Sequence, residues 1–398
     1  MSVPPGGEVL GLAALMRRVF AGEDLGPVAQ GFIDRAGRDP ADAAALLDLA
    51  TALFLADNAD LARTVQAQAL QVRRLYRLAR PVAAAPAALR VLALAAPGEL
   101  AANTPLDFLI EGSDVELDFF YMDADGAAAP PPLADYDLVF TVIGESDANA
   151  PLLRRAEALL TGCPRPVLNA PGRIARLART DVAAALRGAP GVVVPHTERL
   201  ARADLTAYAR ARGLPLVVRP VDSHAGHGLA RIDEAEALSA YQRDTAGEEF
   251  YVMPFVDYRD ADGAWRKYRV VLIDGRPYAC HMAISSHWMI HYLNAGMRES
   301  AAKRAEEARF FERFDADFAV RHAPALAALH ERIGLDYFGI DCAQTPDGAL
   351  LVFEVDSALI VHDLDPPDLF PYKPAQMHRV FVAFRDLLGR RAGLRPGP

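Results

Sequence analysis

Three carboxylates near a tight turn are the first residues in this chain whose spacing could support chemistry. Asp341, Glu354 and Asp356 flank the turn sequence TPDG (345–348) in the stretch DCAQTPDGALLVFEVD. Proline and glycine at these positions are typical of a tight turn, so the stretch predicts a β-hairpin. If the turn is centred between its second and third residues, Asp341 lies opposite Val352. Glu354 is then its diagonal neighbour, and Asp356 shares the same sheet face.

Three carboxylates on one face favour a bound cation. Like charges that lie close together raise one another's pKa, so the arrangement is costly unless a positive group lies among them. The chain has no histidine or cysteine spacing typical of zinc. Hard oxygen ligands therefore favour Mg²⁺, with Mn²⁺ as an alternative, and protein-bound Mg²⁺ usually also contacts nucleotide phosphates. The other interpretation is a solvated hairpin face that is simply polar.

Composition limits the classes of protein that fit. The chain has 398 residues, of which 52% are hydrophobic and 24% charged, as expected for a soluble globular protein with two or three domains. A net charge of −10 argues against nucleic acid or an anionic membrane as the main partner. Three distant cysteines, Cys163, Cys280 and Cys342, suggest reduced thiols. We therefore expect a cytoplasmic protein without a signal peptide or a membrane span.

The first 82 residues predict a helical module. Alanine- and leucine-rich helical periodicity runs through residues 41–76. With Ala50 and Ala62 where two helices would approach closely, and Ala69 and Tyr76 later, the pattern resembles one tetratricopeptide-type repeat. Such a module would bind a protein or peptide partner, or else only pack against the rest of the chain.

Residues 88–175 predict an α/β domain after a proline- and alanine-rich linker. Apolar strands are expected at 89–96, 115–122 and 136–144, and a helix at 148–160. Strands that alternate with helices indicate a parallel sheet covered on both faces.

The segment GLPLVVRPVDSHAGHGLARI predicts a strand, a glycine loop and a second strand. The first strand ends at Arg219. Glycines allow backbone amides to close around an anion, and a cation at the strand end can neutralise it. The loop residues that could contribute are Ser223, His224, Gly226, His227 and Gly228. An ordinary hairpin is the other interpretation.

Two further elements complete an ordered series. An apolar strand is expected at 248–258, and a hairpin at 263–284 carries Arg269 on its first strand. In this order, the glycine loop, the apolar strand, the arginine hairpin and the acidic hairpin resemble the ATP-grasp superfamily. The resemblance is to carboxylate–amine ligases of the glutathione synthetase and ribosomal-protein-glutamate-ligase type.

The resemblance implies a fold of α/β and α+β class with three parts. These are the N-terminal helical module (1–82), a Rossmann-like pre-ATP-grasp domain (88–175) and a two-lobed ATP-grasp domain (176–390). The N-lobe would cover about 176–250 and the C-lobe about 251–390.

The resemblance also assigns roles to residues. Arg179 and Arg219 would hold ATP phosphates beneath the glycine loop, and Arg269 would stabilise the reacting acyl phosphate. Adenine would be read by the backbone of Pro254, Phe255 and Val256, and Mg²⁺ held by Asp341, Glu354 and Asp356. The chain departs from the family pattern in having arginine at 179 and 219 where lysine is usual, aspartate at 356 where asparagine is commoner, and a proline without an N–H at 254.

The implied reaction is ADP-forming ligation of a carboxylate to an amine or similar nucleophile. The substrate would be a small amino-acid-like molecule or a peptide. A non-catalytic ATP-binding scaffold and a kinase-like phosphoryl transfer are the alternatives, and a homodimer is compatible with either class. Candidate substrate contacts are His281, His287, Trp288, His291, Asn294 and Lys373.

Overall fold

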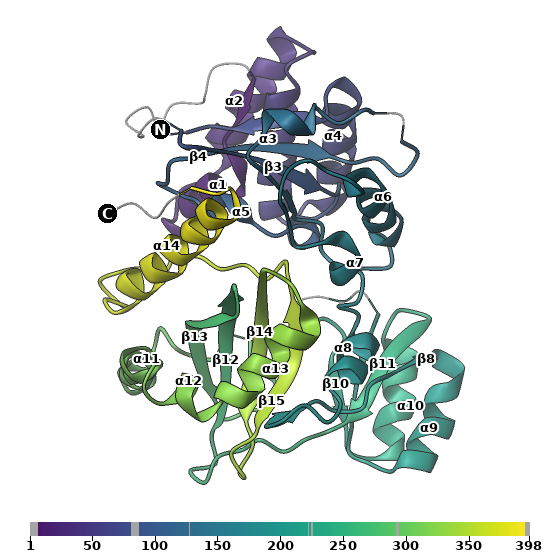
Figure 1. Cartoon of the computed structure of the whole chain (residues 1–398). Coiled ribbons are helices and arrows are strands. Elements are labelled where there is room, and N and C mark those ends of the chain that lie inside the picture. Colours follow the sequence, from purple (N-terminus) through teal and green to yellow (C-terminus); the bar gives the residue numbers. More distant parts are fainter. Residues whose placement is uncertain are drawn as a thin grey trace. The chain divides into compact units, whose positions relative to one another are not determined.

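The computed structural model describes residues 7–80, 87–126, 128–221, 223, 226–291 and 294–394 (Figure 1). The chain forms two compact units. Unit 1 comprises Met1–Ala175, Leu335–Phe338 and Ser357–Pro398, and unit 2 comprises Arg176–Gly334 and Gly339–Asp356. Both contain helices and sheets, so the predicted mixed α/β fold class is confirmed.

A six-stranded sheet forms the centre of the described part of unit 1. Its strand order is β1-β2-β4-β3-β5-β6. Strand β3 pairs in parallel with β4 and β5, and β5 in parallel with β6, as expected from the alternating pattern, whereas β2 pairs antiparallel with β4 and makes the sheet a mixed one. The strands are β1 (Glu8–Val9), β2 (Leu75–Leu78), β3 (Leu89–Ala95), β4 (Val115–Tyr121), β5 (Leu138–Thr141) and β6 (Val167–Leu168).

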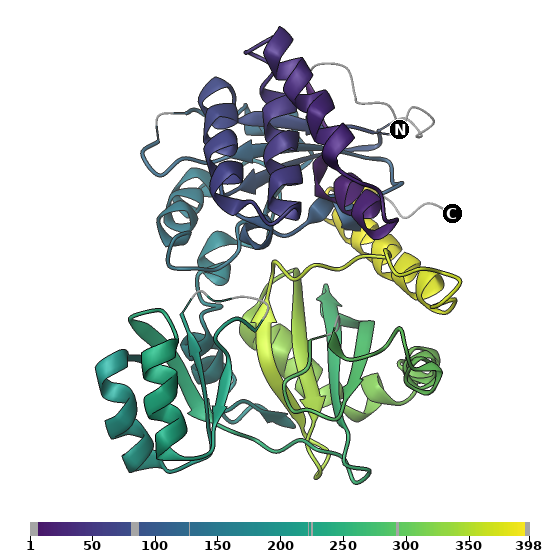
Figure 2. The same ribbon diagram turned by 180° about the vertical axis from the view of Figure 1, so that it is seen from behind.

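Four N-terminal helices belong to the same unit as this sheet. They are α1 (Gly11–Phe20), α2 (Gly26–Arg38), α3 (Ala43–Leu55) and α4 (Ala59–Val72), and they are seen in front of the sheet in Figure 2. A buried cluster joins α3 and α4 to strands β1 and β2. The apolar faces of these helices are thus covered by the sheet and by one another.

The tetratricopeptide-like interpretation is not confirmed. Helix α4 ends at Val72, and Tyr76 lies in β2, where its hydroxyl donates to the carbonyl of Ala69 at 2.8 Å. Strand β2 pairs with β4, so the segments before and after the predicted boundary at 82–88 share one sheet and one compact unit. A four-residue strand directly after an alanine-rich helix is too short to show a clear period of two, which is why the sequence did not reveal it.

The C-terminal helix α14 (Lys373–Arg391) also belongs to unit 1. Its Phe384 ring lies 5.8 Å from that of Phe140 on β5 and 5.2 Å from that of Tyr337. The predicted ATP-grasp domain, 176–390, therefore extends beyond compact unit 2, which ends at Asp356. The shorter helices of unit 1 are α5 (Leu106–Leu109), α6 (Ala150–Leu160) and α7 (Pro171–Ile174), with 3₁₀ turns η1 (Leu100–Ala102) and η2 (Leu133–Asp135).

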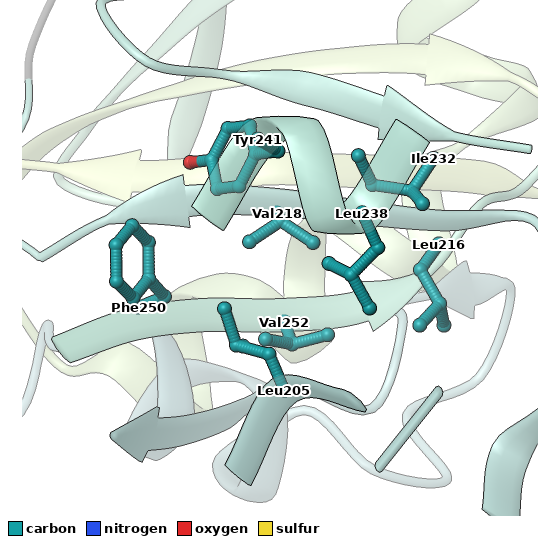
Figure 3. Close-up of a cluster of buried hydrophobic side chains, with 8 residues drawn as sticks. All are labelled: Leu205, Leu216, Val218, Ile232, Leu238, Tyr241, Phe250 and Val252. Carbon is teal, nitrogen blue, oxygen red and sulfur yellow. The ribbon is translucent and has the colours of Figure 1, made fainter. Parts of the chain in front are cut away.

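The first sheet of unit 2 carries the glycine loop. It has the order β10-β9-β11-β8 in antiparallel pairing, and helices α9 and α10 pack against it. Alternate residues of β9 and β11 point into a core with Leu205, Leu238 and Tyr241 of the helices (Figure 3). The elements are β8 (Glu198–Ala201), η3 (Arg202–Asp204), α9 (Leu205–Arg212), β9 (Leu216–Pro220), β10 (Ala230–Ile232), α10 (Ala235–Asp244) and β11 (Glu249–Pro254).

The second sheet of unit 2 carries both predicted hairpins. Its order is β13-β12-β14-β15-β7. The strands are β7 (Val192–Val193), β12 (Trp265–Ile273), β13 (Arg276–Ser285), β14 (Tyr337–Gln344) and β15 (Leu350–Asp356), and the remaining helices are α8 (Arg179–Ala185), α11 (Ala301–Arg313), α12 (Phe318–Arg321) and α13 (Ala323–Ile333).

Among the helices in the described ranges, none has the length and apolar character needed to span a membrane.

Candidate functional site

The acidic hairpin forms with a register different from the predicted one. Asp341 lies directly opposite Glu354 rather than Val352. The turn accounts for one residue of the difference, because Gln344 pairs with Leu350, and a β-bulge after Asp341 accounts for the second. Each one-residue slip exchanges the two sheet faces, so two slips restore the original face. The prediction that the three acids share one face therefore agrees with the observed pairing.

Asp341 is buried among cationic side chains. The neighbouring strand β12 supplies Arg269, whose Nε and Nη2 donate to the two carboxylate oxygens at 2.8 and 3.0 Å. Lys267 Nζ lies 2.8 Å from Asp341 Oδ2. Burial raises the pKa of Asp341, but Arg269 and Lys267 outweigh it and hold this pKa well below its usual range. Asp341 is therefore a carboxylate at neutral pH.

Glu354 is paired with the first predicted phosphate cation. Arg179, the first residue of α8, places Nη2 2.9 Å from Glu354 Oε1 and donates through Nη1 to the carbonyl of Phe353 at 2.9 Å. Phe353 is the residue that the bulge leaves without a partner in the β14–β15 pairing. Burial raises the pKa of Glu354, but Arg179, Arg219 and Lys267 together outweigh this effect, so that the pKa is lowered overall.

The second predicted phosphate cation, Arg219, is buried at the end of β9. Its Nε donates to Ser223 Oγ at 3.2 Å, and the Ser223 hydroxyl donates to the carbonyl of Pro220 at 2.8 Å. Burial and the positive charge of Arg179 lower the pKa of Arg219 to about 10. Two guanidinium groups thus lie close enough to repel one another beside Glu354.

The described residues of the glycine loop are held close to Arg219 through Ser223. Gly226 and Gly228 have positive φ angles of 78° and 66°. A Cβ at Gly228 would lie 2.7 Å from Pro220 Cδ, so only glycine fits there without displacement. Tyr241 fixes the loop by donating to the carbonyl of Gly228 at 2.6 Å. His227 is exposed, and predicted His224 lies outside the described residues.

Two histidines of the predicted substrate set interact with the acid face. His281 lies across the β12–β13 pairing from Arg269, and its charge contributes to the lowered pKa of Asp341. The pKa of His291 is lowered by burial, and then by Lys267 and Arg269. The lowered pKa keeps the His291 imidazole neutral at physiological pH, which is the form with a free acceptor nitrogen.

The other predicted substrate residues have local partners. Trp288 stacks edge-on against Phe255 at 5.7 Å, and Asn294 Oδ1 accepts the backbone N–H of His291 at 3.1 Å. His287 is exposed. Lys373 belongs to unit 1, where its Nζ lies 2.6 Å from Asp365 Oδ2. These contacts agree with packing roles, and a role in substrate binding stays a prediction.

The predicted adenine-reading segment follows β11. Phe255 donates its backbone N–H to the carbonyl of Pro215 at 3.1 Å, and the guanidinium of Arg231 lies 4.1 Å from its ring centre. Pro254 has no N–H, so a hinge contact through an N–H falls to Val256.

Lys267 was not singled out from the sequence. The signal that could have found it is its spacing, because residues i and i+2 of a strand lie on the same face. Lys267 and Arg269 therefore both face Asp341.

The three acids fit a hard divalent cation in ligand type and in their shared face. In the present arrangement, however, cationic side chains bind Asp341 and Glu354. Across the part of the chain that is described, no group of three or more histidine, cysteine, aspartate or glutamate side chains is arranged to hold a metal ion. A metal ion could bind Asp341 and Glu354 only if one or more of these cationic side chains moved to another partner.

No protein-family model and no curated protein matches this chain. Among solved structures, it is similar to a RimK domain protein ATP-grasp from Sphaerobacter thermophilus, with 18% identity, 75% of this chain and 99% of that chain covered, and a TM-score of 0.43. It is also similar to D-alanine–D-alanine ligase from Coxiella burnetii (13%, 77% and 96%, 0.46) and to the D-cycloserine synthetase DcsG (16%, 73% and 99%, 0.41).

Proposed function

We propose that this protein is an ATP-dependent ligase of the ATP-grasp type. It would convert a carboxylate into an acyl phosphate and join it to an amine or similar nucleophile, with release of ADP and phosphate. The observation that carries the proposal is the pair formed by Arg179, which contacts Glu354, and Arg219, which contacts Ser223 of the glycine loop and is acted on by the charge of Arg179. Repulsion between two guanidinium groups is costly, and a polyphosphate would relieve it.

The two arginines would bind the phosphates of ATP. A guanidinium group forms two parallel hydrogen bonds to phosphate oxygens, which suits Arg179 and Arg219 to this role even where lysine is usual in the family. Ser223 already holds Arg219 in place from the loop side. Closure of the loop around Gly226 and Gly228 would exclude water from a labile acyl phosphate.

Asp341, Glu354 and Asp356 would hold Mg²⁺, or alternatively Mn²⁺. When bound, the ion would neutralise charge on the β- and γ-phosphates. Arg269, held by its two contacts with Asp341, would stabilise the oxyanion that forms on the reacting carboxylate. The site therefore keeps its positive charge in place before the nucleotide arrives, which suits a reaction that depends on charge neutralisation and alignment.

His291 would act as general base toward the incoming amine. Its pKa is lowered by burial and by the neighbouring cations, so the imidazole is neutral and can take up a proton near pH 7. His281 would contact the substrate carboxylate from the strand opposite Arg269. The substrate class, a small amino-acid-like molecule or a peptide, and a protein partner or homodimer remain predictions.

Release of ADP tests the proposal. Purified protein is incubated with Mg·ATP and pools of amino acids, small carboxylic acids and amines, and ADP and phosphate are measured together. Release of both that requires one acid and one amine supports ligation. A phosphorylated product without ligation would instead indicate a kinase-like transfer. Nucleotide binding without turnover in any pool would indicate the non-catalytic scaffold.

A further inference from the structure

We infer that Lys267 competes with the divalent cation for Asp341, so that the acid face accepts a metal ion only together with the nucleotide. The inference rests on the proposed nucleotide site and adds an order of binding to it. It arises from one feature that the proposed function does not use, the ammonium group 2.8 Å from Asp341 Oδ2.

A single cation, Arg269, is enough to pair the carboxylate of Asp341. Arg269 alone donates to both carboxylate oxygens, at 2.8 and 3.0 Å, and the Asp341 side chain is only 6% exposed. Lys267 adds a third charged contact to the same small group. A metal ion that binds Asp341 must therefore displace at least one cationic donor.

Of the two cations, Lys267 is the one that can leave Asp341 when a metal ion binds. The guanidinium of Arg269 is a planar group fixed by two parallel contacts, whereas an ammonium is a point charge on a flexible four-carbon chain. The Lys267 and Arg269 side chains are almost equally exposed, at 17% and 18%, so the difference lies in how firmly each one is held. Phosphate oxygens are the natural new partner of Lys267 once a nucleotide is present.

The charge balance of the face makes the exchange depend on nucleotide. Lys267 and Arg269 contact Asp341, and Arg179 contacts Glu354. In the described contacts of these two carboxylates, three cationic side chains thus meet two acids, an excess of positive charge. A divalent ion alone would increase this excess, whereas the several negative charges of a nucleotide triphosphate would reverse it.

Binding of Mn²⁺ without nucleotide tests the inference directly. Free Mn²⁺ is followed by electron paramagnetic resonance as it is titrated with wild-type protein and with the variants Lys267→Met, Lys267→Arg and Lys303→Met. Lys303 is the matched control, because it also lies in unit 2 but donates to the carbonyl of Ala295. Each titration is repeated with a non-hydrolysable ATP analogue.

Without nucleotide, we expect weak Mn²⁺ binding to the wild type, Lys303→Met and Lys267→Arg. Lys267→Met should bind Mn²⁺ at least about tenfold more tightly, because it removes a positive charge that lies 2.8 Å from Asp341 Oδ2 and repels the ion. With the analogue, the wild type should gain Mn²⁺ affinity. Equal nucleotide-free affinity of wild type and a folded Lys267→Met would overturn the inference.

Two results keep the inference and the proposed function separable. If Lys267→Met does not fold, the wild type alone decides: tight Mn²⁺ binding without nucleotide overturns the inference, and binding only with the analogue supports it. If the analogue does not bind the wild type at all while Lys267→Met gains Mn²⁺ affinity, the competition stands and the proposed ATP site fails.

Discussion

Asp341 on β14 lies directly across the hairpin from Glu354 on β15, and each carboxylate has its own arginine partner. The partners come from different elements, Arg269 from β12 and Arg179 from the first turn of α8. The buried Asp341 and the half-buried Glu354 can therefore face each other without becoming protonated. In the proposed site, these paired arginines and carboxylates are the groups that would contact the nucleotide and the metal ion.

Loss of Arg269 should destabilise the protein. Arg269→Ala leaves Asp341 buried with Lys267 as its remaining cation, and removal of one partner of a buried ion pair costs about 3 kcal/mol. The free energy of unfolding is measured by urea denaturation. The control is Arg313→Ala, which breaks an exposed helical pair with Asp317 and should have little effect. Equal losses in the two variants would contradict the assignment of Asp341 as a paired buried carboxylate.

Two buried aspartates should make the stability of unit 1 depend on pH. Asp48 accepts the backbone N–H groups of Leu10 and Gly11, and Asp107 that of Ala13, all at the start of α1. Burial raises the pKa of Asp48 to about 7 and that of Asp107 to about 6. A folded-state pKa above the unfolded value means that the folded state binds more protons between the two values, so stability falls as pH rises from about 4 to about 7.

Thermal unfolding from about pH 5 to about pH 8 checks this dependence. The melting temperature of the wild type should fall across the range, and Asp48→Asn should show a shallower slope because the asparagine does not titrate. The control Asp34→Asn, on the exposed face of α2, should keep the wild-type slope. A wild-type melting temperature that rises with pH would contradict the raised pKa of both aspartates.

The glycine loop should tolerate no side chain at position 228. In Gly228→Ala, the new Cβ would lie 2.7 Å from Pro220 Cδ at a φ of 66°, so the loop over Arg219 must shift. We expect at least about tenfold weaker binding of an ATP analogue, since 1.4 kcal/mol of displaced contacts is a factor of ten. Gly263→Ala has a similar φ of 80° with nothing within 4 Å of its Cβ, and it should retain binding. The affinities of the two variants for the analogue are measured by calorimetry, and equal affinities would contradict a role of position 228 in binding.

His291 should set the acid limb of the activity profile. Because its pKa is lowered, ligase activity should persist below the ordinary pKa of histidine, about 6.5, and fall only at more acidic pH. His291→Gln should lower kcat and remove this limb. His287→Gln, in the same segment but exposed, should keep it. An unchanged limb in His291→Gln would exclude the imidazole as the base.

Patterns within single elements predicted the fold of unit 2 and the residues of the acid face. The hairpin turn, the apolar strands and the arginine at the end of β9 each have a local signature, and β9, β11, β12 and β14 formed where expected. The predicted register of the acidic hairpin was wrong. The alternation of residue types reveals neither the left-handed backbone of Gly348, with a φ of 87°, nor the bulge after Asp341.

Features that depend on contacts between distant segments could not be predicted. Strand β2 joins the sheet of unit 1 through β4, about forty residues later in the chain, and α14 packs its Phe384 against β5. The partner of Lys267 lies on a strand more than seventy residues away. Such pairings are decided by tertiary packing, and local propensity carries no information about them.

Calorimetric titration with a non-hydrolysable ATP analogue, with and without Mg²⁺, tests the central claim most directly. It is made on the wild type, on Arg219→Met and on the matched control Arg212→Met, whose arginine is exposed and paired with Glu198. We predict Mg²⁺-dependent binding that Arg212→Met retains and Arg219→Met loses. Absence of binding by the wild type, or equal binding by the two variants, would show that the Arg179–Arg219 pair is not a phosphate site.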